Sequence, residues 1–105
     1  MLELDKTTFE TEVLQASGKV VMDFYGEGCV PCAALMPHIH HFDELYGDKI
    51  KFCALNTNLA RRIAFSQKIM GLPAIAIYEN GAIVEICMKD DATPENVEAM
   101  IKRHI

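Results

Sequence analysis

The sequence predicts an α/β fold in which a mixed five-stranded sheet carries four helices on its two faces, in the order βαβαβαββα. Residues 19–25 are apolar nearly throughout and rich in Val and aromatic side chains, which is typical of a central strand buried on both faces. Segments with helical periodicity separate the first three strands, so those strands are expected to be parallel. The pair Asn80-Gly81 between two apolar runs is a strong hairpin signal, so the last two strands are expected to be antiparallel.

The N-terminal elements are predicted to be short. Met1 to Leu4 is expected to form the first strand. Thr7 or Thr8 can cap the helix that follows, in which apolar residues recur at helical spacing. Ser17-Gly18 is expected to end that helix directly before the second strand.

The longest predicted helix runs from Pro31 to Tyr46. Pro37 lies inside it, and we expect a kink there because proline removes a backbone hydrogen bond and clashes with the preceding turn. The remaining predicted elements are a strand at 50–55, a short helix at 59–67, strands at 74–78 and 82–88, and a last helix that Thr93 caps and Pro94 begins.

Length and composition are those of one ordinary globular domain covering residues 1–105, with 24% of the residues charged. The net charge of −5 argues against non-specific binding to nucleic acid, which needs Lys and Arg to neutralise phosphates. No apolar run approaches the ~20 residues of a membrane span, and the N-terminus lacks the pattern of a signal peptide. We therefore expect a cytoplasmic protein that does not bind membranes and whose four cysteines are kept reduced.

Two cysteines stand where the second strand meets the long helix, in the segment Gly28-Cys29-Val30-Pro31-Cys32. A helix N-terminus offers unsatisfied N–H groups and a partial positive charge, which lower the pKa of a thiol placed there. Cys29, at the outer edge of the turn, is therefore the expected nucleophile. Cys32, about one turn inside the helix, is placed to attack the sulfur of Cys29. Pro31 fits the first turn because its missing N–H would have no partner there.

Over essentially its whole length the sequence resembles the thioredoxin family. A lone CxxC pair would be weak support, but here the pair follows an Asp-bearing strand and precedes a Gly-hydrophobic-Pro segment further along the chain. The matching segments are residues 21–25, Cys29-x-Pro31-Cys32, Pro37, residues 43–49, Leu55-Asn56, Gly71-Leu72-Pro73 and residues 78–81. The resemblance implies the thioredoxin fold.

The resemblance also implies roles for four residues. Cys29 attacks a disulfide in a substrate protein to form a mixed disulfide, and Cys32 resolves it, leaving an oxidised Cys29–Cys32 pair. Pro73 corresponds to the family's cis-proline, whose neighbouring backbone binds an extended substrate segment. Asp23 corresponds to the family's buried acid. Because burial raises the pKa of a carboxyl group, Asp23 is expected to accept the proton of Cys32, directly or through a water molecule.

Two positions away from the motif depart from the family's usual pattern. Ala54 replaces a Lys near the buried acid, so desolvation is expected to raise the pKa of Asp23 with no cation to oppose it. Lys89 stands where a Gly usually lines the substrate groove, and we expect its side chain to narrow the groove or to favour acidic partners.

The flanks of the motif also depart from that pattern. Gly28 and Val30 stand beside the first cysteine where Trp and Gly are usual, and Tyr25 replaces another Trp. A Gly-Cys-Val-Pro-Cys site is similar to those in thioredoxins of amino-acid-fermenting anaerobes. That resemblance implies delivery of electrons to glycine-reductase-type selenoproteins.

The resemblance implies thioredoxin reductase as the electron donor, disulfide-containing proteins as substrates, and no tightly bound cofactor. The protein is expected to be a monomer. The substrate is expected to contact Val30, Pro31, Leu72, Pro73 and Lys89. We favour a docking patch over core plugs for Val30 and Leu72, because both are apolar residues on loops that flank the thiols.

Three other interpretations remain. Cys29, Cys32, Cys53 and Cys87 could together bind zinc or an iron–sulfur centre, but the chain has no second CxxC, and Cys53 and Cys87 are expected to be small buried hydrophobic residues in strands. A glutaredoxin-like use of glutathione lacks the Tyr common in that family's Cys-Pro-Tyr-Cys loop. A non-catalytic binding module would keep the fold and hold one partner through the patch around Val30, Leu72 and Lys89.

Overall fold

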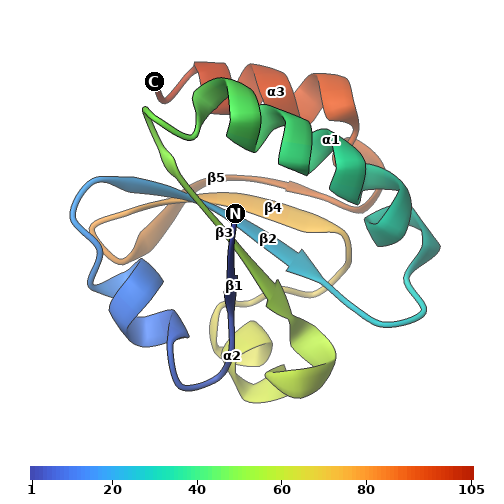
Figure 1. Ribbon diagram of the computed structural model, residues 1–105. Helices are drawn as coiled ribbons and strands as arrows, with labels where there is room; N and C mark the ends of the chain where they lie inside the picture. The colour runs from blue at the N-terminus through green and yellow to red at the C-terminus, as the bar shows by residue number, and fades with distance from the viewer.

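The computed structural model describes residues 1–105, and its centre is a five-stranded sheet in the order β1-β3-β2-β4-β5 (Figure 1). The strands are β1 (Leu2–Leu4), β2 (Lys19–Tyr25), β3 (Lys51–Asn56), β4 (Ala74–Glu79) and β5 (Ala82–Met88). β3 is parallel to both β1 and β2, whereas β4 is antiparallel to both β2 and β5. The mixed sheet predicted from the sequence is confirmed.

Helices cover both faces of this sheet, as predicted. They are η1 (Glu10–Leu14), α1 (Val30–Tyr46), η2 (Thr57–Leu59), α2 (Arg61–Ser66), η3 (Lys89–Asp91) and α3 (Pro94–Lys102). α1 and α3 lie side by side on one face, and η1 and α2 lie on the other (Figure 1). No helix among them combines the length and the apolar character that a membrane crossing needs.

The first helical segment begins differently from the sequence prediction. Phe9 is the N-cap of η1 and makes no side-chain cap hydrogen bond. The turn that leads into η1 is capped by Asp5 instead of Thr7 or Thr8, because Oδ1 of Asp5 accepts hydrogen bonds from the amides of Thr7 (2.7 Å) and Thr8 (3.1 Å). The amide of Asp5 in turn donates a hydrogen bond to Oγ1 of Thr8 over 3.0 Å. The backbone amides of Asp5 and Thr8 are thus each bonded to the side chain of the other residue, as in a capping box. η1 closes with a hydrogen bond from the amide of Gln15 to the carbonyl of Glu10, five residues back, which makes it a π-helical turn.

The helix predicted at 59–67 is divided into the two shorter helices η2 and α2. Asn56 caps η2, because its side-chain oxygen accepts a hydrogen bond from the amide of Asn58 over 3.0 Å. Ala60, between the two helices, has an extended φ of −147°, which interrupts the helical path.

β2 separates two apolar cores. Its side chains alternate between the two faces, so that Val20, Met22 and Phe24 pack on the side of η1 and α2. Val21 packs on the side of α1 and α3. Asp23 follows Val21 on that second face and is the one buried charged residue of the chain. The fold therefore places a carboxyl group beneath the layer that contains α1.

Candidate active site

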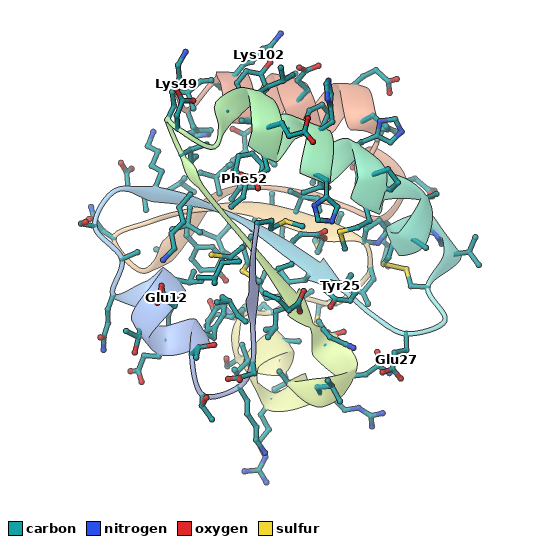
Figure 2. The ribbon with its side chains drawn as sticks, in the orientation of Figure 1. Glu12, Tyr25, Glu27, Lys49, Phe52 and Lys102 are labelled. Atoms are coloured by element: carbon teal, nitrogen blue, oxygen red, sulfur yellow. A yellow bond between two sulfur atoms is a disulfide. The ribbon has the colours of Figure 1, made fainter.

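The redox pair lies where β2 leads into α1. Cys29 caps α1, and Cys29 and Cys32 form a disulfide with their Cα atoms 5.3 Å apart (Figure 2). The amide of Cys32 donates a hydrogen bond to Sγ of Cys29 over 3.2 Å. Gly28, directly before the pair, has a φ of +74°, a backbone conformation that glycine adopts without steric cost. The predicted strand–turn–helix setting of the two cysteines is confirmed.

The two sulfur-bearing residues differ in their access to solvent. Cys32 is buried, with 4% of its surface exposed, whereas Cys29 is half-buried and borders an apolar groove of about 730 Å³. The groove is lined by Tyr25, Gly26, Gly28, Cys29, Val30, Cys32, Ala33, Met36, Pro37 and His40. Val30, with 77% of its surface exposed, and the exposed Pro31 form the first turn of the helix. Cys29 is therefore the more exposed of the two cysteines that line this groove.

Asp23 carries the expected shift in its acidity. Only 2% of its surface is exposed, and burial, followed by the negative charge of Glu3, raises its pKa from 3.8 to about 7. Ala54, which is in register with Asp23 on β3, supplies no cation that would oppose this rise. A carboxyl group with this pKa exchanges protons with its surroundings near neutral pH.

The loop that precedes β4 contains the second group of predicted residues. The peptide bond between Leu72 and Pro73 is cis, as the resemblance implied, and Pro73 itself is buried. Leu72 lines a second, smaller hollow of about 430 Å³, which shares Gly26 with the main groove. Val30 and Leu72 therefore border two adjoining hollows rather than one continuous groove.

Lys89 is attached to this loop. Its amide donates a hydrogen bond to the carbonyl of Pro73 over 2.9 Å, and its φ of 55° lies in the left-handed region. The stem of its side chain lies directly over Gly71, where an added Cβ would overlap Cε of Lys89 and come within 2.8 Å of Cγ. Lys89 thus covers the start of the cis-proline loop and lines neither hollow.

Sequence reasoning missed part of the groove wall. Ala33, Met36 and His40 line the groove together with Cys29. These four positions recur at helical spacing along α1, and that periodicity was the available signal. From the sequence alone, a solvated helix surface is the expectation for His38, His40 and His41. His40 is exposed, and it also borders the groove.

Comparison with known proteins agrees with this geometry. The sequence profile named Thioredoxin matches residues 1–103. The chain belongs to the thioredoxin family. It is 53% identical to the thioredoxin of Acetoanaerobium sticklandii over 105 residues, and this alignment covers 100% of both chains. It is 50% identical over 105 residues to the thioredoxin of Peptoclostridium acidaminophilum, covering 100% of this chain and 96% of that one. The thioredoxin of Buchnera aphidicola is 33% identical over 98 residues, or 86% of this chain and 91% of its own.

Family membership defines the general activity of this thioredoxin. Sequence identities of 50% and 53% to two thioredoxins over the full chain support a thioredoxin-type protein-disulfide reductase. Its pair Cys29 and Cys32 is able to form the redox disulfide. Both of these relatives come from amino-acid-fermenting clostridia, so the group of thioredoxins predicted from the Gly-Cys-Val-Pro-Cys segment is confirmed.

The other two cysteines of this thioredoxin lie on opposite faces of the sheet. Cys53 is fully buried in the core beneath η1 and α2, and burial raises its pKa to about 11. Cys87 is half-buried on the face of α1 and α3, with its Sγ 3.8 Å from Sδ of Met100. Because the sheet separates these two thiols, they do not join the redox pair in the four-thiol metal site considered from the sequence. No three His, Cys, Asp or Glu side chains are grouped so as to hold a metal ion.

Proposed function

We propose that this thioredoxin reduces disulfide bonds of cytoplasmic proteins, with Cys29 as the attacking thiolate and Cys32 as the resolving thiol. The observation that carries this assignment is the hydrogen bond from the amide of Cys32 to Sγ of Cys29 at the N-terminus of α1. The same donor would stabilise a negative charge on the Cys29 sulfur after the disulfide has been reduced. Helix N-termini favour anions, and a thiol placed there has a lowered pKa.

In the first step the thiolate of Cys29 attacks one sulfur of the substrate disulfide. A bond forms between Sγ of Cys29 and that sulfur, the substrate S–S bond breaks, and the second substrate sulfur leaves and takes a proton from solvent. We assign the positioning of the substrate to Val30 and Pro31 in the first turn of α1 and to Leu72 and the backbone at Pro73. Support for this comes from the exposure of Val30 and from the hollow beside Leu72.

In the second step Cys32 loses its proton and its thiolate attacks Sγ of Cys29. The bond between Cys29 and the substrate breaks, the Cys29–Cys32 disulfide forms, and the remaining substrate sulfur leaves with a proton from solvent. In total, two electrons and two protons pass to the substrate. Asp23 accepts the proton of Cys32, and its pKa of about 7 supports this role because the carboxyl can take up and release a proton at neutral pH.

The partners follow from the family. A thioredoxin reductase returns the oxidised pair to the dithiol, and Lys89 favours acidic substrate segments near the cis-proline loop. We further infer that the substrates include glycine-reductase-type selenoproteins. The support for this inference is the segment at residues 28–32 and the likeness to the thioredoxins of A. sticklandii and P. acidaminophilum.

Single replacements test the two thiol roles. Cys29→Ser should abolish the reduction of insulin disulfides, and Cys32→Ser should complete the first step and accumulate a mixed disulfide. Cys87→Ser removes a thiol outside the pair and serves as the control that should retain activity. Insulin reduction by Cys29→Ser at the wild-type rate would overturn the assignment.

The reduction potential of the pair tests the direction of electron flow. It is measured by equilibrating the protein in defined thiol–disulfide buffers and trapping the free thiols. A value near −270 mV, about that of thioredoxins which act as reductants, is expected. A value nearer about −180 to −120 mV, the range of the oxidising members of the fold, would reverse the proposed direction.

A further inference from the structure

A row of three side chains crosses the sheet beside the proposed proton acceptor. Glu3 of β1 is in register with Ala54 of β3, and Ala54 is in register with Asp23 of β2. Paired residues on neighbouring strands point to the same face, so all three face the side of α1 and α3. Neighbouring strands lie about 4.8 Å apart, so the two acidic residues start about 10 Å apart, with Ala54 on the strand between them.

Tyr25 holds Glu3 in this row. Its hydroxyl donates a hydrogen bond to Oε2 of Glu3 over 2.8 Å. Tyr25 lies at the carboxyl end of β2 (Figure 2), on the same face as Asp23, so its ring has to cross β3 to reach β1. The small side chain of Ala54 leaves that path open. A Lys at this position, as is usual in the family, would compete with the ring for the same space.

The N-terminal ammonium of Met1 is a cation on the same face as Asp23, and Oδ2 of Asp43 on α1 neutralises it over 2.6 Å. Most side chains on the Asp23 face of β3, β4, α1 and α3 are apolar: Phe52, Ala54, Ile75, Ile77, Leu35, Ile39, Met100 and Ile101. Asn56 of β3 is polar and uncharged. α1 adds Asp43, the thiol of Cys32 and, at the surface, His40. Lys19 shares the face but lies at the opposite end of β2, where its Nζ is 3.1 Å from Nδ1 of His104. Of the charged groups on this face, Glu3 is the one whose charge contributes to the raised pKa of Asp23.

We propose that Glu3, held by Tyr25, raises the pH at which Asp23 gives up its proton. Glu3 is a positioning residue, because it acts on the reaction through Asp23 and touches neither sulfur. The effect on catalysis rests on the proposed role of Asp23 as proton acceptor for Cys32. Its direction follows from electrostatics, since a second negative charge nearby disfavours the ionised form of a carboxyl group.

The pKa values of Asp23 and Tyr25, the two residues that neighbour Glu3, agree with this arrangement. Burial is the larger cause of the raised pKa of Asp23, and the charge of Glu3 adds to it. Burial and then the hydrogen bond to Glu3 raise the pKa of Tyr25 to about 12. Tyr25 therefore keeps its proton throughout the neutral range and remains a donor to Glu3. In this chain the Lys usual at position 54 is absent, and an anion held by a tyrosine lies one strand beyond that position.

The test is a titration of the Asp23 carboxyl carbon by NMR in the reduced protein. Glu3→Gln should lower the pKa of Asp23 by about 0.5, the size expected for one charge across two strands at partial burial. Tyr25→Phe should lower it less, because the carboxylate of Glu3 remains but is free to turn toward solvent. Tyr25→Phe added to Glu3→Gln should cause no further fall. Glu10→Gln removes the same charge from an exposed residue of η1, on the other face of the sheet, and should leave Asp23 unchanged.

An unchanged Asp23 titration in Glu3→Gln, or an equal change in Glu10→Gln, would overturn the proposal. The titration does not depend on turnover, so it is independent of the proposed catalytic role. The pH profile of insulin reduction is the second readout and should move to lower pH in Glu3→Gln together with the titration. A lowered pKa of Asp23 with an unmoved rate profile would support the influence of Glu3 and overturn Asp23 as the proton acceptor.

Discussion

The side-chain stem of Lys89 lies across the α-carbon of Gly71, at the start of the loop that ends in the cis peptide bond before Pro73. Two residues far apart in the sequence thus share one space, because only a residue without a Cβ fits beneath the stem. Gly71 has no left-handed φ, so the stem, rather than the backbone, is what an added methyl group would meet.

We predict that Gly71→Ala destabilises the protein by about 1 kcal/mol, because the stem of Lys89 has to move away. In a Lys89→Ala background the same change should cost less, since the obstructing carbons are gone. Alanine retains the Cβ of residue 89, so the cost of its left-handed φ is the same in both backgrounds. Urea unfolding of the two single variants and the double variant measures the coupling. Strictly additive changes would contradict the close packing of these residues.

The position of Cys29 at the cap of α1 leads to a prediction about its thiol. In a Cys32→Ser variant, which leaves one active-site thiol, the pKa of Cys29 should fall below the ~8.5 of free cysteine. The amide at position 32 remains in that variant and still donates toward Sγ. The pH dependence of alkylation by iodoacetamide gives the value. Cys53 is fully buried and supplies an internal control that should not react in the folded protein. A pKa at or above that of free cysteine would contradict the proposed activation.

Burial of Asp23 leads to a pH-dependent stability. Its pKa is about 7 in the folded protein and 3.8 ordinarily, so between these values the folded state holds a proton that the unfolded state has released. The free energy of unfolding should therefore fall as the pH rises from about 4 to about 7. Each pKa unit corresponds to about 1.4 kcal/mol, so the full loss is about 4 kcal/mol.

Asp23→Asn removes this dependence and should be more stable than the wild type at pH 8, with the advantage vanishing below about pH 4. Chemical denaturation across the pH range measures both effects. Asp48→Asn removes a carboxylate from an exposed position and is the matched control. If Asp23→Asn were no more stable than the wild type at pH 8, the raised pKa of Asp23 would be wrong.

Local sequence signals were sufficient for most of the fold. The continuous apolar run at 19–25 is the central strand, and the turn at Asn80-Gly81 has the two positive φ values, 53° and 80°, that such a hairpin turn requires. α1 continues through Pro37, and the kink expected there stays a prediction. The cis bond before Pro73 came from the family resemblance, because an X-Pro bond alone is cis in only about 5% of cases.

Side-chain contacts between distant segments were not predictable in the same way. The link between Tyr25 and Glu3 depends on the parallel register of β1 and β3 and on the small size of Ala54. The packing of Lys89 over Gly71 depends on where the loop before β4 folds back. Neither contact has a signal in the spacing of residues along the chain. The capping role of Asp5 in the turn before η1 was missed for a simpler reason, since Asp5 and both threonines are all good capping residues.

The exposed first turn of α1 gives a prediction that separates docking from chemistry. Val30→Ser should slow the reduction of insulin several-fold, because it removes an apolar contact beside Cys29, and should leave the reaction with a small aromatic disulfide nearly unchanged. Stability should change little, since 77% of Val30 is exposed. Val84→Ser, on β5 and 47% exposed, is the control that should affect neither rate. Equal slowing with both substrates would mean that Val30 acts on the reactivity of the thiols, and an unchanged rate with insulin would remove Val30 from the docking surface.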